Sequence, residues 1–118
     1  MKKLNKLKGA QAENLAKQIL QSKNYQILGT NLSYSFGEVD ILAQDDKTLV
    51  IVEVKFKSSP LFGRAEEMIT KAKKHKLINL AQFLAKQYHM ENVRIDVVAI
   101  NNEDYTHYVN AVEEYGRD

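Results

Sequence analysis

Three charged residues stand in stretches of the sequence that are otherwise apolar. Asp40 lies in the apolar run 39–42, and Glu53 and Lys55 lie in the apolar run 49–56. An unpaired charge is costly to bury, so a charged group in an apolar strand normally has an ionic partner, a metal ion or a chemical task. Two carboxylates and a lysine on adjacent strands therefore indicate a site that holds a cation or a phosphate.

The spacing of the two carboxylates predicts that they face each other across a hairpin. Side chains alternate along a strand, so Glu53 and Lys55 share one face. If residues 46–47 form a two-residue turn, counting outward pairs Asp40 with Glu53, with Cβ atoms roughly 4.5–5.5 Å apart. A three-residue turn would place Asp40 opposite Val52, on the other face, so the prediction depends on an even turn.

Carboxylates held that close repel each other unless a cation lies between them or one takes up a proton. Lys55 neutralises only part of the charge, and a divalent cation neutralises more. Ligands that are oxygens alone favour a hard ion, which predicts Mg²⁺ or Mn²⁺ on Asp40 and Glu53, with the backbone carbonyl of Val54 as a third ligand. The alternative is a salt-bridge network in which Lys55 bridges the two acids. The spacing leaves both alternatives open.

Two predicted helices carry further charged residues. Residues 5–23 follow the i, i+3, i+4 apolar pattern, and Glu13 falls at the edge of that stripe, where it is either a site residue or an ordinary boundary residue. In the helix predicted over 65–88, Lys73 falls near the centre of the apolar stripe and Lys76 slightly to one side. A lysine there either extends to water or points into a charged pocket.

The order of the predicted elements gives the fold class. Besides the two helices, strands are expected at 25–32, 38–44, 48–56, 93–100 and 105–112. The order α-β-β-β-α-β-β predicts one α/β domain over residues 1–118, with a mixed β-sheet of about five strands flanked by helices. The helical connection between the third and fourth strands predicts a parallel, right-handed crossover.

Composition narrows the class of protein. The chain has no cysteine and no apolar run near 18 residues, so we expect no disulfide, no thiolate zinc site and no transmembrane helix. No apolar segment follows the basic stretch 1–9, which favours a cytoplasmic protein over a secreted one. Lysines cluster at 2–8 and 71–76. Such clusters follow a phosphate backbone in nucleic-acid-binding proteins, although a solvated charged face has the same composition.

These residues and their neighbours resemble the motifs of the small bacterial YraN family, which is largely uncharacterised. In chain order the motifs are Ala12-Glu13, Gly37-Glu38-Val39-Asp40-Ile41-Leu42, Val52-Glu53-Val54-Lys55, Phe62-Gly63, Ile69-Thr70 with Lys73, and Arg94-Ile95-Asp96-Val97-Val98. That family is assigned to the PD-(D/E)XK nuclease superfamily and is similar in its core to archaeal Holliday junction resolvases. The likeness runs from about residue 9 to residue 100 and implies a restriction-endonuclease-like core. Val39 stands where the superfamily's proline would precede the aspartate.

The resemblance implies a metal-dependent endonuclease that hydrolyses phosphodiester bonds in DNA, with branched or structured DNA as the expected substrate. In that case Asp40 and Glu53 bind Mg²⁺ or Mn²⁺. Lys55 positions the attacking water and faces the scissile phosphate. Glu13 completes the acidic site, through water or a second ion.

Residues around this set receive supporting roles from their positions in the predicted strands and helices. Glu38 would lie opposite Lys55 in the same register as its partner, and Lys73 and Lys76 would hold phosphate or orient a carboxylate. Asp96, on a neighbouring strand, is equally compatible with a structural role. A homodimer follows only by analogy with resolvases, which act on symmetric DNA.

Two other functions fit the same residues. One is a nucleic-acid-binding module that has the nuclease fold with little or no catalysis, and whose DNA binding would survive the loss of Glu53. The other is a structural protein in which Asp40, Glu53 and Lys55 form a salt-bridge network. It would bind no metal and would lose much stability without Lys55.

Overall fold

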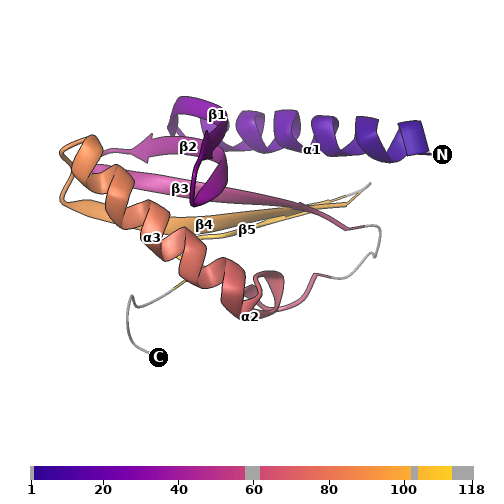
Figure 1. Ribbon diagram of the computed structural model, residues 1–118. Helices are drawn as coiled ribbons and strands as arrows, with labels where there is room; N and C mark the ends of the chain where they lie inside the picture. Colours follow the sequence, from indigo (N-terminus) through magenta and orange to yellow (C-terminus); the bar gives the residue numbers. More distant parts are fainter. Residues whose placement is uncertain (1, 58–61, 102–103, 113–118) are drawn as a thin grey trace.

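A computed structural model describes residues 2–57, 62–101 and 104–112 of the chain, with the backbone alone at 2–8, 65 and 66. It has a five-stranded sheet with helices on both faces (Figure 1). The elements are α1 (Lys2–Ser22), β1 (Gln26–Tyr34), β2 (Gly37–Asp45), β3 (Thr48–Phe56), α2 (Ala65–Met68), α3 (Lys71–Gln87), β4 (Asn92–Ile100) and β5 (Tyr105–Tyr108). Within these ranges, no helix is long and apolar enough to cross a membrane.

The five strands lie in the sheet in the order in which they occur in the chain. β1, β2 and β3 form antiparallel neighbours, β3 and β4 are parallel, and β5 is antiparallel to β4. The parallel pair is connected through α2 and α3, as the sequence predicted. The mixed sheet and its element order are therefore confirmed, and the architecture is that of a restriction-endonuclease-like core.

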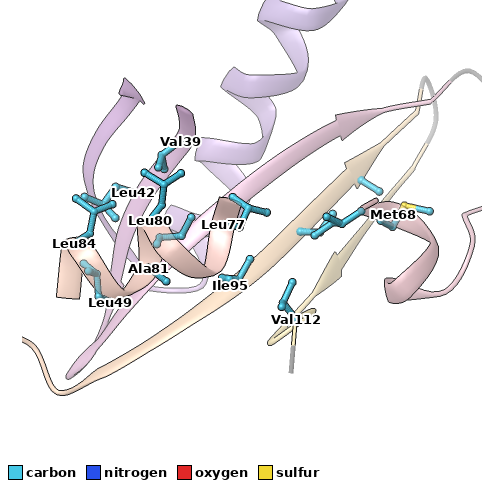
Figure 2. Packing of buried hydrophobic residues seen from close by; sticks show 14 residues of the cluster. Val39, Leu42, Leu49, Met68, Leu77, Leu80, Ala81, Leu84, Ile95 and Val112 are labelled. Atoms are coloured by element: carbon cyan, nitrogen blue, oxygen red, sulfur yellow. The ribbon is translucent and has the colours of Figure 1, made fainter. Parts of the chain in front are cut away.

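Alternating side chains of the sheet form one core with each helix. On one face, Ala12, Ala16 and Leu20 of α1 pack with Ile41, Ala43, Val50, Val52, Val98 and Ile100. On the other face, Leu77, Leu80, Ala81 and Leu84 of α3 pack with Val39, Leu42, Leu49 and Ile95 (Figure 2). Because Leu49 and Ile51 belong to the α3 core, the same alternation directs Glu53 and Lys55 to the α3 face.

The turn between β2 and β3 has the length on which the predicted site depends. Asp45 pairs with Thr48, so residues 46 and 47 form a two-residue turn. Asp46 has a φ of 57°, a conformation that such turns need and that aspartate tolerates. The predicted even register is therefore confirmed at the turn.

The prediction of one helix over 65–88 is wrong in one respect, because the segment forms two helices, α2 and α3. Ile69 is extended, with φ −132° and ψ 128°. Thr70 then caps α3, since its side chain accepts a hydrogen bond of 3.2 Å from the backbone N–H of Lys73. This cap fixes the first turn of α3 and thereby the direction of Lys73.

The last strand is shorter than the predicted 105–112. The chain turns at Asn110, which has a φ of 57° and donates its N–H to Asp96 Oδ1 at 2.9 Å. The N–H of Ala111 donates to the carbonyl of Ile95 at 2.7 Å. Residues 110 and 111 therefore stay beside β4, but the regular antiparallel pairing of β5 ends at residue 108.

Gly37 follows the turn at 35–36 in a backbone conformation that favours glycine. Its φ is +151°, and a Cβ at this position would lie 2.9 Å from Cδ1 of Leu80, a fully buried core residue. We expect Gly37→Ala to lower the free energy of unfolding by about 1–3 kcal/mol, measured by urea denaturation. The matched control is Gly9→Ala in α1, which meets open space and should add about 0.5–1 kcal/mol. A Gly37→Ala protein as stable as the wild type would contradict this account of the turn.

Candidate functional site

The strands β2 and β3 separate at the predicted site. Their ladder runs from the turn to the pair Ile41–Val52 and ends there, whereas β2 continues beside β1 and β3 continues beside β4. Asp40 and Glu53 would form the next pair. The predicted register of the β2–β3 hairpin is therefore confirmed as far as the pair Ile41–Val52. The predicted pairing of Asp40 with Glu53 in the ladder is wrong, because the two strands separate before it.

The carboxylate of Asp40 takes the place of the missing ladder. In a continued antiparallel ladder, the N–H of Val54 would donate to a backbone carbonyl of β2. It donates instead to Asp40 Oδ2 at 2.9 Å. This hydrogen bond holds the Asp40 carboxylate against β3, next to Glu53, and leaves Oδ1 for another ligand.

Glu53 is the buried member of the site, with 5% of its surface exposed. The Nζ atoms of Lys73 and Lys55 lie 3.5 Å and 3.7 Å from the same oxygen, Oε2. Burial raises the pKa of Glu53, and the charge of Asp40 raises it further, while the two lysines offset only part of the shift. A cation bound between the two acids would act in the same direction as the lysines and favour the ionised form.

A salt-bridge network accounts for part of this arrangement. Lys55 and Lys73 both contact Glu53. In the part of the chain that the structure describes, neither lysine forms an ion pair with Asp40. The salt-bridge alternative requires a lysine that bridges Asp40 and Glu53. Among the contacts of the described residues, no lysine does so.

Lys73 lines a pocket that also contains Lys76 and Glu38, which favours the charged-pocket alternative for this residue. The pocket has a volume of about 330 Å³ and is lined by Tyr34, Gly37, Glu38, Lys73, Lys76, Leu77 and Leu80. Glu38 lies beyond the end of the β2–β3 ladder, so its backbone pairs with Ser33 of β1 and not with Lys55. The predicted register of Glu38 with Lys55 is therefore wrong, and Glu38 lines the pocket with Lys73 and Lys76.

Glu13 is half-buried on α1, the helix that covers the opposite face of the sheet from Glu53. Over residues 2–57, 62–101 and 104–112, no three His, Asp or Glu side chains come close enough to hold one metal ion. The structure thus brings together Asp40 and Glu53 but not Glu13, whose role stays a prediction. Two carboxylates still fit Mg²⁺, which keeps several waters and binds through one or two carboxylates plus substrate phosphates.

Asp96 belongs to a separate, buried network on the α1 face. It accepts hydrogen bonds from Arg94 Nε at 3.0 Å, the Asn110 N–H at 2.9 Å and the Tyr25 hydroxyl at 3.3 Å, and His107 Nε2 lies 2.8 Å away. Burial by itself would raise the pKa of Asp96, but the hydrogen bonds from His107, Arg94 and Asn110 lower it below its ordinary value. Of the two roles left open for Asp96, the geometry supports the structural one.

An aromatic cluster beside the pocket was not predicted. Tyr34, Phe36 and Phe83 lie with ring centroids 5.3–6.2 Å apart. The sequence signal that could have found it is helical spacing, because Phe83 follows Lys76 by seven residues and so lies on the same side of α3.

Comparisons with known proteins identify the family. Residues 12–100 match the family described as "Uncharacterised protein family UPF0102". A UPF0102 protein of Vibrio parahaemolyticus is 43% identical over 111 residues, covering 90% of this chain and 92% of that protein. One from Persephonella marina is 39% identical, covering 91% and 94%, and one from Thermodesulfovibrio yellowstonii is 41% identical, covering 87% and 93%. The chain therefore belongs to the UPF0102 family, the YraN-like family whose motifs it carries.

Proposed function

We propose that this protein is a Mg²⁺- or Mn²⁺-dependent endonuclease that hydrolyses phosphodiester bonds in DNA. The observation that carries the proposal is the placement of Glu53. This carboxylate is buried next to Asp40 at the point where the β2–β3 ladder ends, with Lys55 and Lys73 on its Oε2. Two carboxylates held together in this way favour a divalent cation, and lysines of α3 surround the site.

Each residue of the site has a separate role in this proposal. Asp40 and Glu53 hold the cation, with the Val54 carbonyl as a candidate third ligand. When bound, the ion lowers the pKa of its water and stabilises charge on the phosphate. Lys55 has 39% of its side chain exposed, so it can meet an approaching phosphate oxygen and orient the water. Lys73 favours the ionised form of Glu53 and orients its carboxylate.

DNA is the substrate that the surrounding charge fits best. Lys71, Lys73, Lys74 and Lys76 occupy the first half of α3, beside the carboxylates. Such a cluster of lysines neutralises phosphates of a nucleic-acid strand. Branched or structured DNA, a homodimer matched to its symmetry and a role for Glu13 through water or a second ion complete the proposal by family resemblance. The lack of cysteine in the chain favours a cytoplasmic location.

A second candidate is a nucleic-acid-binding module with the same fold and little catalysis. One observation favours it: among the described residues, no third acid joins Asp40 and Glu53. Such a module would keep its salt-sensitive DNA binding when Glu53 is replaced.

A cleavage assay on the wild-type protein separates the two candidates. The substrates are a four-way junction, a flap, a single strand and a linear duplex, each with Mg²⁺, Mn²⁺ or a chelator. The nuclease proposal predicts cutting of at least one substrate with either ion and none with the chelator. If a protein that binds Mn²⁺ and DNA cuts no substrate, the binding module is the better description.

A further inference from the structure

We propose that the pocket beside the carboxylates, together with the aromatic cluster of Tyr34, Phe36 and Phe83, binds an unpaired strand of the DNA substrate. The inference rests on the proposed function and deepens it, because it names the form of DNA that the site takes. Lysines of α3 hold the phosphates of this strand, and the aromatic rings stack on its bases.

The pocket meets the proposed catalytic site at Lys73. Lys73 lines the pocket, and its Nζ lies 3.5 Å from Glu53 Oε2. A strand whose scissile phosphate lies at Lys55 can therefore pass directly into the pocket along Lys73. Lys73 and Lys76 outnumber the one acid of the lining, Glu38, so the pocket suits an anion.

One side of α3 leads from this pocket to the aromatic cluster. Lys73, Lys76, Leu80 and Phe83 follow each other at spacings of three or four residues, which places them along one stripe of the helix. The ten residue steps from Lys73 to Phe83 span about 15 Å of helix axis. At the stacked rise of about 3.4 Å per nucleotide, this length accommodates roughly four nucleotides.

The cluster itself has the properties of a base-stacking platform. Phe36 is 40% exposed and Phe83 is 42% exposed, although both are large apolar residues. Their ring centroids lie 5.3 Å apart with an interplanar angle of 88°. Exposed rings beside a basic groove are the combination that single-strand-binding proteins use, with each base–ring stack contributing about 1–3 kcal/mol.

This combination selects unpaired DNA over a duplex. In a duplex each base face is covered by its neighbours, so the protein meets mainly phosphates and groove edges. An unpaired strand offers its base faces to Phe36 and Phe83. The lysines alone would bind the phosphates of both unpaired and duplex DNA. The preference for unpaired DNA therefore comes from the aromatic rings.

The experiment is a binding titration of the full chain in chelator, by fluorescence anisotropy, with duplexes that carry single-stranded tails of 0, 2, 4 and 8 nucleotides. We expect affinity to rise with tail length up to about four nucleotides and then to level off. The double variant Phe36→Leu/Phe83→Leu keeps apolar bulk and removes the rings, and it should lose at least about tenfold in affinity for the four-nucleotide tail. Its affinity for the blunt duplex should stay unchanged.

Matched controls separate stacking from charge. Leu15→Ala removes an exposed apolar side chain from α1, on the other face, and should change neither affinity. Lys76→Ala should weaken binding to all four DNAs and lower the salt slope by about one, whereas Lys47→Ala at the distant β2–β3 turn should not. Thermal melting confirms that each variant is folded.

Three outcomes would overturn the proposal. Single-stranded tails add no affinity for the wild type, or the Phe36→Leu/Phe83→Leu variant gains as much affinity from the tail as the wild type does. In the third outcome, the double variant differs from the wild type only in its self-association, measured by sedimentation. The last would make the cluster an interface between copies. Because DNA binding is measured without metal, a failure of the single-strand subsite can be distinguished from a failure of the proposed nuclease activity. A tail preference in a protein that cuts no DNA supports the subsite and overturns the nuclease, whereas cutting without any tail preference does the reverse.

Discussion

Replacing Glu53 with glutamine is expected to abolish DNA cleavage while making the protein more stable at neutral pH. Glutamine keeps the shape of the side chain but removes the charge that holds the cation. A metal ion contributes several kcal/mol to such a reaction, so the rate should fall by at least about a thousandfold. Glu91→Gln, at an exposed position in the turn before β4, is the matched control and should keep the wild-type rate.

The gain in stability follows from the direction of the pKa shift. Burial and the charge of Asp40 raise the pKa of Glu53 above its ordinary value of 4.5, so the folded protein holds this proton more tightly than the unfolded chain. The ionised carboxylate therefore costs stability, and the cost grows as pH rises from the ordinary value through the raised one. In thermal melts with chelator, Glu53→Gln should exceed the wild type at pH 7, and the difference should shrink at pH 4. A variant that melts well below the wild type at pH 7 would instead support a stabilising salt-bridge network.

Replacing Asp96 with asparagine is expected to give the largest loss of stability. The carboxylate is fully buried, and it partners Arg94, His107 and Tyr25. Without its charge, the largely buried Arg94 guanidinium keeps, among the residues that the structure describes, only the half-exposed Asp45 as an ionic partner. Breaking a buried ion pair on one side costs about 3–5 kcal/mol, which urea denaturation would measure.

The control and the pH dependence make this prediction specific. Asp45→Asn removes the half-exposed partner of Arg94 and should cost less than about 1 kcal/mol. Because the pKa of Asp96 is lowered in the folded state, its contribution is present above the ordinary value of 3.8 and is lost as pH falls through the lowered value. The wild type should therefore lose stability in acid more steeply than Asp96→Asn. Equal losses for the two variants at pH 7 would show that the network is dispensable.

The parts of the site that depend on the local pattern of one strand, turn or helix could be predicted from the sequence. Alternation along β3 put Glu53 and Lys55 on one face, and the turn at 46–47 fixed the register up to the end of the ladder. Helical spacing placed Lys73 on the inner stripe of α3, where it contacts Glu53. Each of these inferences depends on the period of a single element.

Features that depend on tertiary contacts were missed. The parting of β2 from β3 depends on the Asp40 side chain taking the Val54 N–H, which a register count does not show. The end of β5 depends on hydrogen bonds from residues 110 and 111 to β4. The network around Asp96 gathers residues from distant parts of the chain, so no local spacing reveals it. Helical spacing puts Phe83 on the same side of α3 as Lys76, but it does not show that Phe83 meets Tyr34 and Phe36.

The central claim is that Asp40 and Glu53 form a cation site. Titration calorimetry with Mn²⁺ on the wild type, Glu53→Gln and the control Glu91→Gln tests it without DNA or turnover. We expect one Mn²⁺ bound per chain in the wild type and in Glu91→Gln, and no binding in Glu53→Gln. A wild type that binds no Mn²⁺, or a Glu53→Gln protein that binds it as tightly as the wild type, would contradict the claim.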